Sequence, residues 1–153
     1  MKILLVCLGN ICRSPLAEGI LQHKAKLAGL DWEVDSAGPN GFHNGEAPHP
    51  LSQKVASLHQ IDISAQRSRK FKLEDIAHFD KIYAMAADVL IDIQRITKEK
   101  FNPQKVELFL NEIHPGKNED VPDPWYGQED GYHHVFEIIN EACDVIIEKY
   151  KQQ

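Results

Sequence analysis

A cysteine and an arginine that could do chemistry together lie in the segment Cys7-Leu8-Gly9-Asn10-Ile11-Cys12-Arg13. An apolar run precedes this segment and a helical pattern follows it, so we expect a loop that joins a strand to a helix. Such a loop directs backbone N–H groups, and the positive end of the helix dipole, toward one point. The sequence therefore predicts an anion site of phosphate size with a thiol at its mouth.

The residue types in this loop suit nucleophilic chemistry on a tetrahedral oxyanion. N–H groups that attract an anion also favour the thiolate of Cys7 over its thiol. The planar donors of Arg13 can bind two oxygens of the oxyanion, which lysine could not do. Gly9 allows close backbone approach, and Asn10 tolerates a left-handed conformation. Phosphate binding is thus predicted for Leu8, Gly9, Asn10, Ile11, Cys12 and Arg13.

Ser14 follows the loop and begins the helical pattern. We expect it to cap the helix and to offer a hydroxyl donor to the sulfur of Cys7. The thiols allow two other interpretations. Cys7 could be a buried strand thiol, and Cys7 with Cys12 could bind a metal, although a closed zinc site needs four ligands. Arg13 and the loop residues favour the nucleophile, and neither a metal nor a cofactor is expected.

A second chemical segment lies near the end of the chain, from Asn118 to Gly127. Asp123 stands between Pro122 and Pro124, and a stiff backbone holds its carboxyl in one place, as a general acid requires. Its neighbours are aromatic. We expect a deep slot for a flat phenyl ring, lined by Leu8, Phe42, Trp125 and Tyr126.

These segments resemble the signatures of the low molecular weight protein tyrosine phosphatases. The resemblance rests on Val-Cys-x-Gly-Asn-Ile-Cys-Arg-Ser-Pro at residues 6–15 and on Asp-Pro-Trp-Tyr-Gly at residues 123–127, and it covers nearly the whole chain. It implies a phosphocysteine intermediate on Cys7, stabilisation by Arg13, and Asp123 as general acid and then base. The implied substrate is a tyrosine-phosphorylated protein.

The chain departs from the family pattern at several positions. Phe42 replaces a usual tryptophan, and Ala86 replaces an aspartate at the end of the third strand. Gln66 occupies the place of a histidine that helps to hold the loop asparagine, and its amide could do the same. Ser36, at the end of the second strand, is expected to support the phosphate loop.

Four apolar runs and four helical patterns alternate along the chain. The strands are expected at residues 2–8, 32–38, 79–86 and 106–110, and the helices at 14–28, 47–59, about 89–96 and from about 129. This order predicts an α/β fold, a three-layer doubly wound parallel sheet of four strands with helices on both faces. The family resemblance implies the strand order 2-1-3-4.

Length and composition limit the class of protein. At 153 residues we expect one domain, residues 1–153, and a net charge of −6 disfavours nucleic acid or an anionic membrane as partner. No stretch is long enough to span a membrane, and the apolar N-terminal run is too short for a secretory signal. Three cysteines fit a reducing compartment, so we expect a cytoplasmic protein. The sequence does not define the oligomeric state, and a monomer is expected.

Two rival functions and one form of regulation stay open at this point. A thiol-dependent arsenate reductase shares the loop but needs two further cysteines near the third strand, where this chain offers only Cys143 in the last helix. A catalytically silent phosphotyrosine-binding module would be expected to lack Cys7, Arg13 or Asp123. Cys12 is also a candidate redox partner, because peroxide could convert Cys7 to a sulfenic acid that Cys12 captures as a disulfide.

Overall fold

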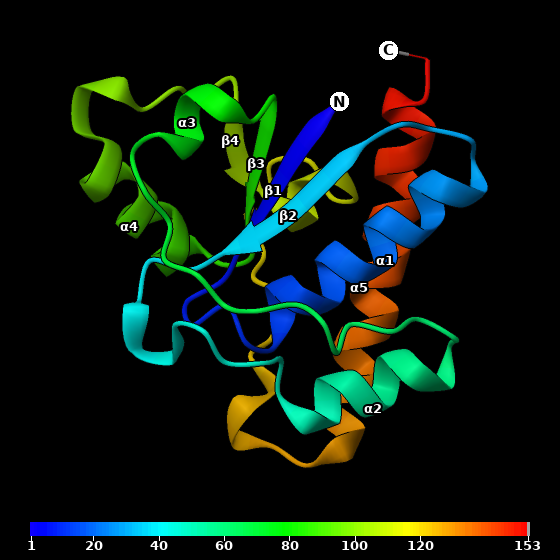
Figure 1. Ribbon diagram of the computed structural model, residues 1–153. Helices are drawn as coiled ribbons and strands as arrows, with labels where there is room; N and C mark the ends of the chain where they lie inside the picture. The colour runs from blue at the N-terminus through cyan, green and yellow to red at the C-terminus, as the bar shows by residue number, and fades with distance from the viewer. Residues whose placement is uncertain (153) are drawn as a thin grey trace.

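A four-stranded parallel sheet forms the centre of the molecule (Figure 1). The structure is a computed structural model that describes residues 1–152. The strands are β1 (Lys2–Val6), β2 (Glu33–Ala37), β3 (Lys81–Ala84) and β4 (Val106–Leu108). Their order in the sheet is β2-β1-β3-β4, with every pair parallel. The predicted order is confirmed.

Strand β1 occupies an inner position and is covered on both faces. Leu5 pairs with Ser36 of β2 on one side and with Tyr83 of β3 on the other. Residues 3–6 have no exposed surface, which explains why this strand reads as a continuous apolar run without alternation. The carboxyl end of β1 therefore delivers Cys7 between the loops that follow β2 and β3.

The helices lie in two layers, one on each face of the sheet (Figure 1). Helices α1 (Arg13–Leu27), α2 (Pro50–Leu58) and α5 (Glu129–Tyr150) pack on one face, where Ile3 and Leu5 point. Helices α3 (Asp75–His78) and α4 (Ala87–Thr97) cover the other face, where Leu4 and Val6 point. The three-layer doubly wound prediction is thus confirmed.

The element bounds differ from the prediction mainly at the ends. Each strand is shorter than expected, and helix α2 begins at Pro50 rather than at residue 47. Helix α3 was not predicted, because its single turn is too short to show a periodic pattern. Short 3-10 helices also occur, at Gly41–His43, Lys98–Lys100, Phe109–Glu112 and Pro124–Tyr126.

One prediction about helix α1 is wrong. Cys12 and not Ser14 occupies the N-cap position, and no side chain caps this end. Ser14 already lies in the first turn, where its hydroxyl is bonded to Asn10 and to Cys7 instead. The end of the helix is thereby left open toward the loop.

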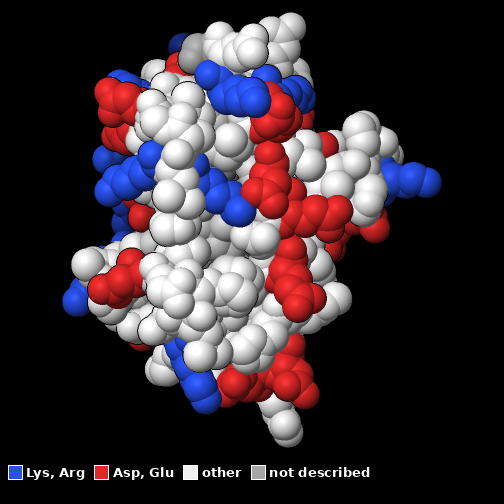
Figure 2. All heavy atoms as spheres, turned by 90° about the vertical axis from the view of Figure 1, so that its right-hand side faces the viewer, with Lys and Arg blue, Asp and Glu red and all other residues white. Residues whose placement is uncertain are grey.

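Charged side chains are unevenly distributed over the surface. Figure 2, which views the molecule from the side of α1 and α5, shows Asp and Glu side chains in a band along one side of this face, with Lys and Arg mostly on the other. Within residues 1–152, no helix has the length and apolar character needed to cross a membrane.

Candidate functional site

A cavity of about 260 Å³ opens at the carboxyl end of β1. The structure gathers around it the predicted nucleophile, the arginine, the acid and all four predicted cleft residues, although they come from distant parts of the chain. The lining comprises Cys7, Leu8, Gly9, Ile11, Cys12, Arg13, Asn40, Phe42, His43, Asp123, Trp125 and Tyr126.

Cys7 lies at the bottom of this cavity, with only 3% of its surface exposed. The backbone N–H of Ser14 donates to its sulfur at 3.3 Å, and the Ser14 hydroxyl lies 3.0 Å from the same sulfur. Two groups from the start of α1 can therefore stabilise negative charge on Sγ. A substrate must enter deeply to reach this sulfur.

The backbone of the loop offers a row of donors. Among the described residues, no protein acceptor receives a hydrogen bond from the backbone N–H groups of residues 8–13. Unpaired N–H groups at a helix start are expected to bind an anion. The loop is thus suited to hold the oxygens of a phosphate group.

Asn10 fixes the shape of the loop. Its φ of 55° is left-handed, and its side chain is almost fully buried. The amide nitrogen donates to the hydroxyls of Ser14 and Ser36, both at 2.9 Å, and the amide oxygen accepts from the backbone N–H of Arg69 at 3.0 Å. Since every polar group of this amide is bonded, the unusual conformation is held without a ligand.

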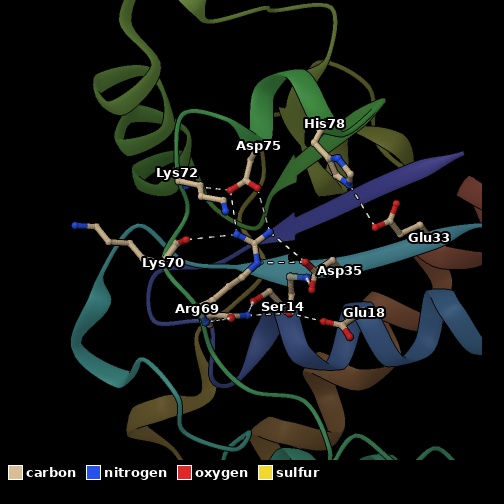
Figure 3. Close-up of polar contacts among 11 residues, drawn as sticks. Ser14, Glu18, Glu33, Asp35, Arg69, Lys70, Lys72, Asp75 and His78 are labelled. Atoms are coloured by element: carbon tan, nitrogen blue, oxygen red, sulfur yellow. Dashed lines mark hydrogen bonds and ion pairs between the residues drawn. The ribbon is translucent and has the colours of Figure 1, made fainter.

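The hydrogen bonds of Asn10 continue to the partly buried carboxyl of Glu18. Ser36 donates its hydroxyl to Glu18 at 2.6 Å, while Asn10 leaves the Ser14 hydroxyl free to donate toward Cys7. Burial raises the pKa of Glu18 to about 7, and nearby Asp35 adds to this rise. A chain of polar contacts therefore runs from the thiol to Glu18 (Figure 3 shows its Glu18 end).

Arg13 and Asp123 meet at the rim. Arg13 is 5% exposed, donates through Nη1 to the Val121 carbonyl at 3.0 Å, and places Nη2 3.8 Å from Asp123 Oδ2. Asp123 also accepts from the Trp125 N–H at 3.1 Å, which makes it the N-cap of the short helix Pro124–Tyr126. One carboxyl oxygen is thereby fixed and the other faces the arginine.

Apolar and aromatic side chains stand above the loop. Phe42 and Tyr126 are 81% and 91% exposed, while Leu8 and Trp125 are about half as exposed. Sequence reasoning missed His43, whose ring lies 5.4 Å from that of Trp125 and which bonds Glu46 at 2.9 Å. It missed Asn40 as well. The signal for both was weak, because they occur among loop residues without periodicity.

Gln66 does not take the role that the family resemblance suggested. Its amide nitrogen donates to the Pro15 carbonyl at 3.1 Å, and its buried oxygen has no hydrogen-bond partner among the described residues. No bond joins it to Asn10, because the backbone of Arg69 fills that place. Gln66 therefore supports the start of α1 rather than the asparagine.

The other two cysteines are protected from solvent. Cys12 lines the cavity floor, and its sulfur lies 3.7 Å from the Tyr132 hydroxyl. Burial raises the pKa of Cys12 to about 12. Cys143 is fully buried in α5, and all three cysteines are free. Within residues 1–152, no cluster of three His, Cys, Asp or Glu side chains is arranged to hold a metal ion.

The cavity combines a deep thiol with a row of N–H donors and a buried arginine, and a carboxyl lies at its rim. On a doubly wound sheet, this arrangement is that of a cysteine-dependent phosphatase site. The comparison with known sequences gives the family. Residues 2–153 match the model of the low molecular weight phosphotyrosine protein phosphatases. The chain belongs to this family, whose members are hydrolases, and the predicted resemblance is confirmed.

Relatives match over most of their length. The low molecular weight phosphotyrosine protein phosphatase of Schizosaccharomyces pombe is 37% identical over 135 residues, which cover 86% of this chain and 85% of that protein. The crystal structure of an Entamoeba histolytica protein tyrosine phosphatase superposes with a TM-score of 0.89 at 34% identity, covering 99% and 97% of the two chains. A Drosophila arginine phosphatase also superposes with a TM-score of 0.89, at 31% identity, covering 99% and 98%.

Proposed function

We propose that this protein removes phosphate from phosphotyrosine side chains of proteins through a phosphocysteine on Cys7. The observation that carries this proposal is the meeting of Cys7, Arg13 and Asp123 around one cavity of about 260 Å³. The thiolate supplies the nucleophile, and the arginine with the loop N–H groups stabilises the equatorial oxygens of the transferring phosphoryl group.

The reaction has two steps. Cys7 Sγ attacks phosphorus in line, the bond from phosphorus to the phenol oxygen breaks, and Asp123 gives its proton to that oxygen. A phenolate is a poor leaving group, because phenols have a pKa of about 10, so this proton accelerates the step. Water then attacks the phosphorus of the phosphocysteine, Asp123 takes a proton from this water, the S–P bond breaks to return the Cys7 thiolate, and phosphate leaves.

The depth of the cavity favours phosphotyrosine over phosphoserine. Cys7 is almost fully buried, whereas the rim residues Phe42 and Tyr126 are largely exposed. A long, flat side chain can reach the sulfur while its ring contacts the aromatic rim. The short side chain of phosphoserine would leave its phosphorus too far from the nucleophile.

A second candidate substrate follows from the Drosophila relative, which is an arginine phosphatase. Phosphoarginine is also long and planar, so it belongs in the assay beside phosphotyrosine. The arsenate reductase alternative finds no support, because Cys143 is fully buried in α5. A silent binding module would have no need for the thiol, arginine and carboxyl that this chain keeps.

The test compares hydrolysis of matched phosphotyrosine, phosphoserine and phosphoarginine peptides by the wild type and by Cys7→Ser. We expect phosphate release from the phosphotyrosine peptide, little from the others, and a loss of about a thousandfold or more in Cys7→Ser. Phosphate binding, followed by calorimetry, should survive in this variant, since Arg13 and the loop remain.

Cys143→Ala is the matched control, because it removes a thiol that lies away from the cavity, and it should keep the wild-type rate. Turnover by Cys7→Ser at the wild-type rate would refute the nucleophile assignment. Faster hydrolysis of phosphoarginine than of phosphotyrosine would assign the substrate to the second candidate instead.

We also propose that the site is redox-sensitive. Cys7 and Cys12 both line the cavity. Peroxide would transfer an oxygen to the Cys7 thiolate and release water, and the Cys12 thiol would then displace water from the sulfenic acid to form a disulfide. Since burial raises the pKa of Cys12 to about 12, Cys12 is a thiol at neutral pH, and we expect capture to be slower than oxidation.

Mass spectrometry after brief treatment with peroxide measures this reaction. We expect a peptide pair linked through Cys7 and Cys12, together with lost activity that dithiothreitol restores. In Cys12→Ser the same treatment should drive Cys7 to the sulfinic acid, so activity stays lost. Overoxidised Cys7 beside a free Cys12 in the wild type would contradict the proposal.

For its location and partners, we propose a cytoplasmic monomer that acts on tyrosine-phosphorylated proteins, with neither nucleic acid nor membrane as partner. Three free cysteines fit a reducing compartment. The net charge of −6 disfavours binding to anionic polymers and surfaces.

A further inference from the structure

A second hollow adjoins the catalytic cavity. It has a volume of about 210 Å³ and shares Leu8 and Asn40 with the cavity. Its other lining residues are Pro39, Lys70, Asp92, Arg95 and Ile96, of which the last three belong to α4. A peptide with its phosphorylated residue in the cavity can therefore pass over Leu8 and Asn40 and reach this hollow.

Lys70 is fixed close to the phosphate loop by its main chain. It forms a parallel bridge with Gly38, whose N–H donates to the Arg69 carbonyl at 3.0 Å and whose carbonyl accepts from Phe71 at 2.7 Å. Gly38 itself touches the loop, since a Cβ there would lie 2.7 Å from the carbonyl oxygen of Leu8. The backbone of Lys70 is thus tied to the floor of the site.

Arg69 strengthens this attachment from the neighbouring position. Its guanidinium donates to both Asp35 and Asp75, at distances of 3.1 to 3.2 Å (Figure 3). Lys70 projects in the opposite direction, and Figure 3 shows its side chain pointing away from this network. The side chain of Lys70 therefore lines the hollow and takes no part in the ion pairs of Arg69.

The hollow carries more positive than negative charge. Among the described residues, no carboxylate pairs with the ammonium of Lys70, and Arg95 pairs with Asp92 at 2.9 Å while its side chain is 73% exposed. Two cations thus face one carboxylate, in a chain whose net charge is −6. This local charge favours an anionic partner.

We propose that the hollow binds an acidic side chain of the substrate protein, placed within a few residues of the phosphotyrosine. This rests on the proposed function, because the phosphotyrosine must occupy the cavity first. The carboxylate would lie between Lys70 and Arg95, both in the lining of the hollow. An extended peptide advances about 3.3 Å per residue, so its neighbouring side chains cross the shared wall at Leu8 and Asn40.

The experiment measures kcat/KM for phosphotyrosine peptides that carry Glu, Gln or Lys at each position from three before to three after the phosphotyrosine. We expect the Glu peptide to be preferred over the Gln peptide about two- to fivefold at one position, as exposed charge pairs allow. The preference should shrink at high salt. Lys70→Met should abolish it, and Lys70→Glu should invert it in favour of Lys.

Two controls separate binding from damage. Lys72→Met removes a lysine that lines a different part of the surface, beside Asp75, and should keep the wild-type preference. Phenyl phosphate is too small to reach the hollow, so its kcat/KM should change less than about twofold in Lys70→Met.

Equal kcat/KM for the Glu and Gln peptides at every position in the wild type would overturn the proposal while leaving the proposed function intact. Equal losses for peptide and phenyl phosphate in Lys70→Met would also overturn it. A wild type that hydrolyses neither phenyl phosphate nor any phosphotyrosine peptide would refute the proposed function itself.

Discussion

Asn10 shows how a single side chain can hold a binding loop ready. Its left-handed backbone costs free energy of about 1 kcal/mol or more, and three hydrogen bonds of its side chain, to Ser14, Ser36 and the backbone N–H of Arg69, offset that cost. Because its amide nitrogen occupies both the Ser14 and Ser36 oxygens, their hydroxyl protons are directed onward to Cys7 and Glu18. The shape of the loop is therefore held by hydrogen bonds within the protein itself.

Glu18, at the far end of this chain of contacts, makes stability depend on pH. Its pKa rises from 4.5 to about 7, first through burial and also through Asp35, while Arg69 acts in the opposite sense. Between these values the folded state binds the proton more tightly than the unfolded state, so the free energy of unfolding falls as pH rises from about 4.5 to 7.

We expect Glu18→Gln to remove this fall in the free energy of unfolding with rising pH. Gln keeps an oxygen that accepts the Ser36 hydroxyl but carries no charge, so above pH 7 the variant should be more stable than the wild type by about 1 to 3 kcal/mol. Urea unfolding at pH 5, 6, 7 and 8 measures the difference. Glu141→Gln, an exposed residue of α5, should leave the pH slope unchanged. A Glu18→Gln slope equal to that of the wild type would contradict the assignment.

At the scale of elements, the site depends on loops held at one edge of the sheet. The loop that carries Asp123 is tied to the end of β3, because the Val121 N–H donates to the Met85 carbonyl at 2.8 Å. The Val121 carbonyl in turn accepts from Arg13. Val121 thus positions both Arg13 and the loop that carries Asp123.

This arrangement predicts how the acid loop responds to mutation. Asp123→Asn keeps the oxygen that caps the Trp125 N–H but loses the acid, so phenyl phosphate should turn over about a hundredfold more slowly. The nitrophenyl ester should slow far less, since nitrophenolate leaves without a proton. Steady-state kinetics on both esters provides the measurement.

Asp120→Asn is the matched control in the same loop, because Asp120 accepts from the Ala87 N–H and its amide could do so too. It should slow both esters equally and slightly. Equal slowing of the two esters by Asp123→Asn would exclude the acid role. Asp123→Ala also loses the hydrogen bond to the Trp125 N–H. The difference in rate between Asp123→Ala and Asp123→Asn therefore measures the contribution of the loop geometry to turnover.

At the scale of the whole molecule, the sequence predicted features formed by residues close together in the chain. It did not predict contacts between residues far apart in the chain. The spacing of Cys7 and Arg13 defined the loop because both belong to one turn between adjacent elements. The strand order came from the family resemblance, since an apolar run does not reveal its neighbours. The bonds from Arg69 to Asp35 and from Gln66 to Pro15 join residues far apart in the chain, so no sequence pattern predicted them.

Contacts between residues far apart in the chain also explain why the role expected for Gln66 was wrong and why His43 was missed. Because Gln66 stands at the place of a histidine, a contact of its amide with Asn10 was expected. In the structure the backbone N–H of Arg69 donates to the Asn10 amide oxygen instead. His43 lines the cavity only because the loop after β2 folds over Gly9, against which the His43 ring lies. Such contacts depend on tertiary packing rather than on residue type.

Cys7 belongs to the first strand–loop unit and Asp123 to the last loop before α5, yet they share one cavity. A nascent chain emerging from the ribosome exposes its thiol and arginine early, while its acid is still unmade. Domains generally fold as units, so Cys7 and Asp123 come together only after the last loop and α5 have been made. A product that ends before residue 123 lacks this carboxyl and also helix α5, whose apolar side chains share one core cluster with those of α1, so we expect it neither to fold stably nor to release phenols efficiently.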